Sequence, residues 1–137
     1  MNPVVHFEMP YENRERIVKF YQSVFSWQTQ MLGEEMGNYV LVTTTESDEN
    51  GPKELGSING GFSNKGLPFA NPYPSFVIAV DDINESIKKI ANAGGKILGE
   101  PMEIPGVGVS AWFVDTEGNR LSVLQPLPHM SVRPKSE

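Results

Sequence analysis

The stretch SFVIAVDDINESIKKIANAGG, residues 75–95, carries the local signals of a strand followed by a helix. Its first residues alternate between two faces, the two-residue period of a strand, with three larger apolar side chains on one face: Phe76, Ile78 and Val80. Asp82 and, three residues later, Glu85 are typical of a helix start. The helix would bury a stripe of four residues: Ile83, Ile87, Ile90 and Ala91. Gly94-Gly95 would end it, because glycine accepts the left-handed conformation.

The beginning of the chain repeats this pattern. Residues 4–9 alternate, which predicts a strand with His6 and Glu8 on one face and apolar side chains on the other. Asn13 can cap a following helix, which would end at Ser26-Trp27. Its apolar stripe contains Ile17, Tyr21, Val24 and Phe25. The two halves of the chain therefore begin with the same strand and helix.

Three strands are predicted after each helix. In the first half they cover residues 27–31, 39–45 and 55–62, and a polar loop at 46–52 separates the last two. In the second half they cover residues 96–104, 110–114 and 120–124, with a tight turn at 115–119. The sequence thus predicts a single α+β domain over residues 1–137. It has two βαβββ modules, module one at about 4–62 and module two at about 75–126, joined by a linker at 63–74. A tail follows at 127–137.

Composition excludes several classes of function. Eleven Lys and Arg against 17 Asp and Glu give a net charge of −6, which disfavours nucleic acid and anionic membranes as partners. The absence of cysteine removes disulfides, thiolate nucleophiles and cysteine-based metal sites. The first residues do not form a signal peptide, and no apolar run is long enough to span a membrane. We therefore expect a cytoplasmic protein.

Five segments together resemble the glyoxalase/bleomycin resistance protein/extradiol dioxygenase superfamily, also called the vicinal oxygen chelate superfamily. They are HFEMP (6–10), FYQSVFSW (20–27), IAVDDI (78–83), AGG (93–95) and FVDTEGNRL (113–121). The resemblance covers residues 4 to about 126. It implies that the two modules form a curved mixed sheet, shaped as a cup with the helices outside. It also implies a homodimer.

The resemblance further implies where a metal would bind. In metal-dependent relatives His, Glu, His and Glu from four strands hold one divalent cation. At the matching positions this sequence has His6, Ser75, Ser122 and either Gly56 or Ser57. Only His6 matches the pattern, and serine hydroxyls or glycine are poor ligands for a catalytic divalent cation. We therefore predict a degenerate metal site and no cofactor, with a divalent metal as the alternative.

Five residues are the candidate ligand-binding set: His6, Glu8, Ser75, Trp112 and Ser122. His6 is expected to pair with Glu8, Ser75 or Ser122, because buried polar groups usually find a partner. His6 and Glu8 are also the candidates for a catalytic base. Trp112 alternates out of phase with its apolar neighbours, so it could stack on a planar ligand or contribute to the core. The pair Gly60-Gly61 predicts a close approach of another element, or space for a ligand.

Three functions remain open from the sequence. The first is metal-free binding of a small organic molecule in the cup, as in bleomycin-resistance proteins. The second is an enzyme, either a metal-dependent lyase, isomerase or ring-cleaving dioxygenase or a metal-free enzyme that uses His6 or Glu8. The third is a protein-interaction module whose cup has collapsed. Fold alone does not choose among them.

Overall fold

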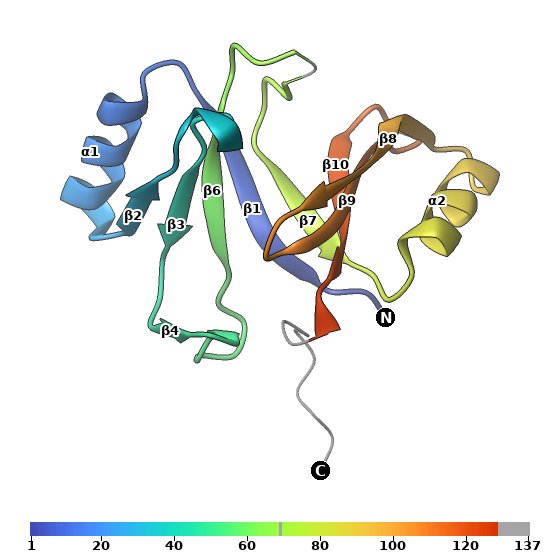
Figure 1. Ribbon diagram of the computed structural model, residues 1–137, viewed down its shortest axis with the longest axis horizontal. Helices are drawn as coiled ribbons and strands as arrows, with labels where there is room; N and C mark the ends of the chain where they lie inside the picture. The colour runs from blue at the N-terminus through green and yellow to red at the C-terminus, as the bar shows by residue number, and fades with distance from the viewer. Residues whose placement is uncertain (69, 129–137) are drawn as a thin grey trace. The chain divides into compact units, whose positions relative to one another are not determined.

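A computed structural model describes residues 1–68 and 70–128 of the chain (Figure 1). By its internal contacts the chain divides into two compact units, His6–Ser75 and Met1–Val5 together with Phe76–Glu137. We use module one for the helices and strands between Val4 and Asn64, and module two for those between Ser75 and Pro126. Each module contains one α-helix and a mixed four-stranded sheet. The predicted α+β class with two βαβββ modules is therefore confirmed.

Module one contains β1 (Val4–Tyr11), α1 (Arg14–Phe25), β2 (Gln28–Met31), the short 3-10 helix η1 (Glu34–Met36), β3 (Val40–Thr43), the small strands β4 (Ser47–Asp48) and β5 (Gly51–Pro52), and β6 (Asn59–Asn64). The sheet order is β2-β3-β6-β1. Strand β6 runs parallel to β1 and antiparallel to β3. Residues 46–52 were predicted as a polar loop, but the structure forms the β4–β5 hairpin there. The last strand begins at Asn59, four residues later than predicted.

Module two has the same topology. It contains β7 (Ser75–Ala79), α2 (Ile83–Asn92), β8 (Lys96–Ile104), β9 (Gly108–Val114) and β10 (Arg120–Pro126). The order is β7-β10-β9-β8, with β10 parallel to β7 and antiparallel to β9. The turn between β9 and β10 is closed by Asp115, whose carboxylate accepts from the backbone N–H groups of Glu117 and Asn119. The repeat seen in the sequence is thus a repeat of structure.

Both helices begin where the sequence predicts. Asn13 accepts a hydrogen bond from the backbone N–H of Arg16 at 2.9 Å, and Asp82 accepts one from Glu85 at 3.1 Å. Helix α1 ends at a left-handed Ser26, with φ 61°. In module two the left-handed residue after the helix is Gly94, with φ 100°. Side-chain capping and a left-handed stop therefore set the length of both helices.

Removing one cap should have a measurable but modest effect. The substitution Asp82→Ala is expected to lower the free energy of unfolding by about 1 kcal/mol, because the N–H of Glu85 loses its acceptor. Urea denaturation would measure the change, with Asp82→Asn, which keeps a side-chain acceptor at the cap, as the control. A loss in Asp82→Ala no larger than the loss in Asp82→Asn would contradict the assignment.

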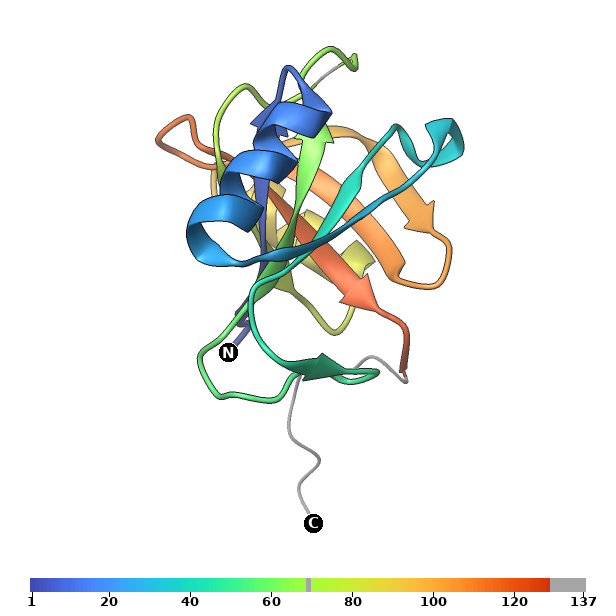
Figure 2. The ribbon, with the colours of Figure 1, turned by 90° about the vertical axis from the view of Figure 1, so that its left-hand side faces the viewer.

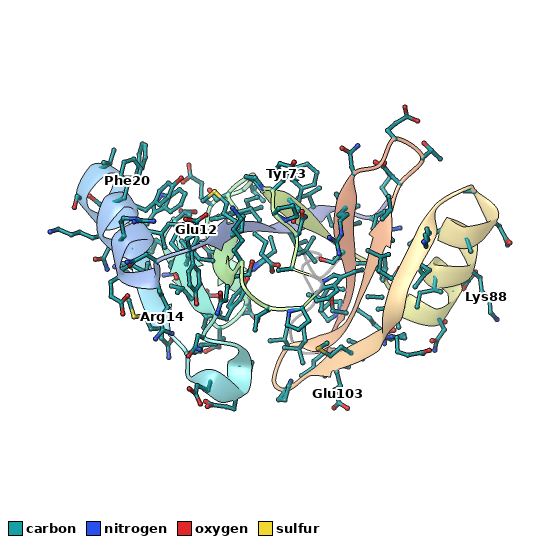
Figure 3. All side chains as sticks on the ribbon, turned by 90° about the horizontal axis from the view of Figure 1, so that it is seen from above. Glu12, Arg14, Phe20, Tyr73, Lys88 and Glu103 are labelled. Carbon is teal, nitrogen blue, oxygen red and sulfur yellow. The ribbon has the colours of Figure 1, made fainter. Side chains whose placement is uncertain are left out.

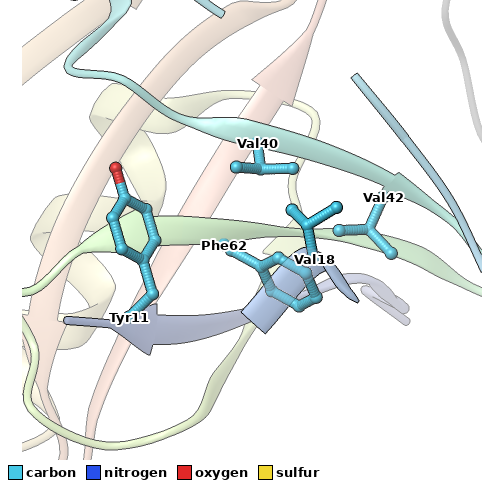
Figure 4. Packing of buried hydrophobic residues seen from close by; sticks show 5 residues of the cluster. All are labelled: Tyr11, Val18, Val40, Val42 and Phe62. Atoms are coloured by element: carbon cyan, nitrogen blue, oxygen red, sulfur yellow. The ribbon is translucent and has the colours of Figure 1, made fainter. Parts of the chain in front are cut away.

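Each sheet is covered on one face by its own helix. In module one the buried cluster joins α1 to the strands through Tyr11, Val18, Val40, Val42 and Phe62 (Figure 4), and α1 lies in front of these strands in Figure 2. Aromatic rings extend this cluster, with Tyr21 stacked on Trp27 at a centroid distance of 4.7 Å. In module two Ile83 of α2 packs with Val80, Ala111 and Val123. The opposite face of each sheet is left without a helix of its own module.

Both helices also carry exposed side chains. Phe20 on α1 is 55% exposed, and Lys88 on α2 is exposed as well (Figure 3). The predicted tail at 127–137 lies outside the described residues except for Leu127 and Pro128. Among the described residues no helix has the length and apolarity needed to cross a membrane.

Candidate ligand-binding site

His6 and Glu8 lie on the face of the module-one sheet opposite α1. Their neighbours on β1, Phe7 and Met9, pack into the cluster beneath the helix. Because successive side chains of a strand point to opposite faces, His6 and Glu8 must point away from α1. The prediction that these two residues share a face, with apolar side chains on the other, is confirmed.

Tyr39, immediately before β3, joins these two side chains. Its hydroxyl lies 2.9 Å from His6 Nε2 and donates a hydrogen bond to Glu8 Oε2 at 3.1 Å. The three residues therefore form a continuous hydrogen-bonded chain, which we call the His6–Tyr39–Glu8 chain. It links two residues of β1 to a residue more than thirty positions away in the sequence.

Gly61 on β6 allows Tyr39 to reach β1. Strand β6 lies between β3 and β1, and Gly61 is paired with Leu41 on one side and with Glu8 on the other. A Cβ atom at Gly61 would overlap the hydroxyl and ring of Tyr39, so the tyrosine lies directly over the bare glycine. On the opposite face the ring of Phe7 covers Gly60 in the same way. The predicted close approach at Gly60-Gly61 is thus made by aromatic rings on both faces of the sheet.

Hydrogen bonds from two other elements hold the backbone around Tyr39. Arg14, the first residue of α1, donates from Nη1 to the carbonyl oxygens of Leu32 at 2.8 Å and Asn38 at 3.3 Å. The Tyr11 hydroxyl donates to the same Asn38 carbonyl at 2.7 Å. The Tyr39 carbonyl accepts from the N–H of Leu32 at 2.8 Å. The segment that carries Tyr39 is therefore fixed by the helix start and by the end of β1.

Burial shifts the acid–base properties of all three side chains. Desolvation lowers the pKa of His6 from 6.5 to about 4, so its ring is neutral at pH 7. Desolvation raises the pKa of Glu8, while the hydrogen bond from Tyr39 opposes that rise. Burial and the adjacent Glu8 raise the pKa of Tyr39 well above its usual value, so the phenol keeps its proton. Perturbed groups gathered at one place are a recognised mark of a functional site.

The donor set does not fit the divalent cation that the fold family implies. A histidine or a carboxylate binds a metal through a free lone pair. The Tyr39 hydroxyl engages His6 Nε2 and Glu8 Oε2, which leaves His6 Nδ1 and the second carboxylate oxygen of Glu8 as the free donors of these two side chains. Within residues 1–68 and 70–128 there is no group of three or more His, Cys, Asp or Glu side chains able to hold a metal ion. Two donors on one strand fall short of the coordination that such ions require.

Strand bounds correct one position in the expected ligand pattern. The sequence matched Gly56 or Ser57 to a ligand position on the last strand of module one, but β6 begins at Asn59, after the turn that contains Gly56. Neither residue therefore lies on that strand, and the residue paired with His6 is Asn59. The side chain of Asn59 is already used, since Oδ1 accepts from the N–H of Thr44 and Nδ2 donates to Ser47 Oγ, both at 2.9 Å. Asn59 therefore fixes the β4–β5 hairpin.

The remaining candidates belong to β7 and to module two. Ser75 is the first residue of β7, at the boundary between the modules. Ser122 on β10 is buried and is the cross-strand neighbour of Trp112 on β9. Trp112 is 39% exposed and alternates with Ala111, which packs under α2, so it lies on the face opposite that helix. Their role in ligand binding stays a prediction.

Sequence reasoning missed Tyr39 as the partner of His6. The expected partners were Glu8, Ser75 and Ser122, and the contact observed is with the tyrosine hydroxyl. A usable signal was present, because Tyr39 alternates with Val40 and Val42, which are buried beneath α1. That alternation places Tyr39 on the same face as His6 once the sheet order is known.

Two sequence relatives carry names related to glyoxalases. Over 69 residues the chain is 38% identical to CFP32 of Mycobacterium tuberculosis, which is named as a glyoxylase; the match covers 50% of this chain and 26% of CFP32. Over 113 residues it is 29% identical to a glyoxylase-like domain-containing protein of Didymella fabae, covering 82% of this chain and 84% of that protein. The chain thus spans only about a quarter of the length of CFP32. A scan of family models found no match.

Solved structures share the fold at low sequence identity. Methylmalonyl-CoA epimerase from Mycobacterium tuberculosis matches with a TM-score of 0.64 at 11% identity, covering 91% of this chain and 88% of the epimerase. A superfamily member from Vibrio splendidus matches with a TM-score of 0.59 at 13% identity, covering 93% and 100%. At such identities the likeness concerns the fold alone. Together with the sequence relatives and the paired βαβββ modules, it shows that this chain has the fold of the glyoxalase/bleomycin resistance protein/dioxygenase superfamily.

Proposed function

We propose that this chain binds a small organic molecule without a metal ion, on the module-one sheet face opposite α1. The observation that supports this proposal is the His6–Tyr39–Glu8 chain, which places three partly buried polar side chains on that face. Burying polar groups costs free energy even when they are paired, so packing alone would be served better by apolar residues. A few polar groups placed on a largely preformed surface are what small-molecule sites use to orient a ligand.

A panel of compounds tests this function directly. Chelator-treated protein would be screened by thermal shift with methylmalonyl-CoA, the methylglyoxal–glutathione adduct and bleomycin, and each hit measured by calorimetry. Binding stabilises the folded state, so a ligand of this site should raise Tm. Loss of the hydroxyl in Tyr39→Phe should weaken binding about tenfold, the effect of one hydrogen bond.

The matched control is Tyr21→Phe in the same module. Tyr21 packs with the cluster beneath α1, and its hydroxyl contacts Met9 Sδ at 3.9 Å. This variant should keep the affinity of the unmodified chain. Equal weakening in both variants, or no shift in Tm with any compound, would count against binding at the His6–Tyr39–Glu8 chain.

Metal removal gives a separate prediction. Dialysis against EDTA is expected to leave Tm and ligand affinity unchanged, because residues 1–68 and 70–128 include no group of three or more His, Cys, Asp or Glu side chains able to hold a metal ion. Elemental analysis of the purified protein would be run beside the melting curve. One zinc, nickel, iron or manganese per chain, with a fall in Tm on chelation, would overturn metal independence.

An enzymatic function is the second candidate, and the names of the relatives favour it. CFP32 is named as a glyoxylase, and several solved structures of this fold are methylmalonyl-CoA epimerases. Activity on the methylglyoxal–glutathione adduct or on methylmalonyl-CoA, lost on chelation, would establish a metal-dependent lyase or isomerase. The same assays on chelated protein would detect a metal-free enzyme that uses His6 or Glu8.

Two broader expectations accompany the proposed function. We propose that the chain acts in the cytoplasm and forms a homodimer, as the superfamily resemblance implies. Light scattering after size-exclusion chromatography would give the mass in solution, to be compared with 15.2 kDa for one chain. Fractionation of cells that produce the protein would give its location.

A further inference from the structure

The direction of the hydrogen bonds in the His6–Tyr39–Glu8 chain determines which ring nitrogen of His6 is protonated. A phenol has a single proton, and the Tyr39 hydroxyl donates it to Glu8 Oε2. Tyr39 Oη must therefore be the acceptor in its 2.9 Å contact with His6 Nε2. A neutral imidazole also carries a single ring proton. That proton is consequently on Nε2, and Nδ1 carries a lone pair.

Nδ1 is the nitrogen that remains open to a ligand. It has no hydrogen-bond partner within residues 1–68 and 70–128. Every fully buried side-chain nitrogen or oxygen of those residues does have a partner. It follows that Nδ1 is not fully buried among the described residues. The imidazole is thus anchored through one nitrogen and presents the other as an acceptor.

We infer that the site recognises ligands that donate an N–H or O–H group to His6 Nδ1, such as an alcohol, phenol, enol or amide. This inference rests on the proposed function, since it assumes that the ligand binds on this sheet face. A carboxylate or phosphate that has no proton to donate would face the lone pair of Nδ1 and be repelled by it. The Glu8 carboxylate of the same chain adds repulsion between like charges, so both effects disfavour the binding of such anions. Glu8 acts through Tyr39 and is a positioning residue for the imidazole.

Nitrogen NMR on ligand-free protein tests the protonation of His6. The chain has two histidines, His6 and His129, so a His129→Gln background leaves one imidazole to observe after ¹⁵N labelling. At pH 7 we expect the ring proton on Nε2, with slow exchange because Tyr39 accepts it. In Tyr39→Phe that exchange should become at least tenfold faster, whereas Tyr21→Phe should leave it unchanged. A proton on Nδ1 in the His129→Gln protein, or equal exchange in all variants, would overturn the inference.

A matched pair of probes tests the ligand class on the same samples. Phenol and anisole share an aromatic ring, but only phenol has an O–H to donate. Phenol is expected to shift the Nδ1 resonance and to bind at least tenfold more tightly than anisole, which corresponds to about 1.4 kcal/mol. Equal binding of the two probes, or no shift at Nδ1, would overturn the donor class.

The two experiments separate this inference from the proposed function. The position of the ring proton is measured without any ligand, so this part of the inference is tested independently of the compound panel. If the proton is on Nε2 but neither the panel nor phenol binds, the proposed function fails, and the donor class fails with it. If panel compounds bind with Nδ1 protonated, the function survives and the donor class is wrong.

Discussion

Replacing Gly61 with alanine is expected to lower the free energy of unfolding by roughly 3 kcal/mol, the range for introducing a side chain into a filled space and leaving buried polar groups unpaired. The new Cβ would occupy the position of the Tyr39 hydroxyl and ring. The Tyr39 side chain would have to move away from the sheet, and His6 and Glu8 would lose their hydrogen bonds to its hydroxyl. Urea denaturation measures the loss.

A double-mutant cycle assigns that loss to Tyr39. In a Tyr39→Ala background Gly61→Ala should cost little, because the ring that it displaces is gone. Gly60→Ala is the matched variant on the opposite face, where the added Cβ would meet the ring of Phe7. It should also destabilise the protein but leave the nitrogen spectrum of His6 unchanged. An equal cost of Gly61→Ala with and without Tyr39 would contradict the arrangement described here.

Acidification from pH 7 to pH 4 is expected to remove up to about 3 kcal/mol of stability through His6 alone. The pKa of His6 is lowered from 6.5 to about 4 in the folded protein, so the unfolded chain takes up the proton first. The stabilisation is therefore complete above pH 6.5 and is lost progressively as the pH falls to about 4. At 1.36 kcal/mol for each unit of pKa, the shift gives the stated magnitude.

Glu8 contributes with the opposite sign over part of the same range. Because burial raises its pKa, the folded state holds its proton more tightly, and this contribution is present at low pH and lost as the pH rises. The effect of His6 is therefore measured as the difference in lost stability between the unmodified chain and His6→Gln. The unmodified chain should lose up to about 3 kcal/mol more than His6→Gln between pH 7 and pH 4 in urea titrations. The control is His129→Gln, which should lose as much stability as the unmodified chain if the effect belongs to His6. Parallel curves of unfolding free energy against pH for the unmodified chain and His6→Gln would refute the assignment.

The position of His6 and Glu8 could be predicted from the sequence because it depends on a short-range rule. Alternation along β1 assigns a face to each residue from its immediate neighbours, and the burial of Phe7 and Met9 confirms the assignment. The helix starts at Asn13 and Asp82 were predictable for the same reason, since the cap and its N–H are three residues apart.

The partner of His6 could not be predicted in this way. Tyr39 reaches it across an intervening strand, and that contact depends on the sheet order and on the absence of a side chain at Gly61. The start of the last strand of module one was predicted too early for a related reason. The β4–β5 hairpin and the turn at Gly56 take up residues before β6 begins at Asn59.

By itself the sequence determined the two βαβββ modules, the ends of both helices and the face of β1 that carries His6 and Glu8. These features follow from periodicity and capping, which act over a few neighbouring residues. Only the tertiary structure decided that Tyr39 lies over Gly61 and joins His6 to Glu8. The physical reason is that strand register and the space above a glycine depend on residues far apart in the chain, which meet only when the sheet forms.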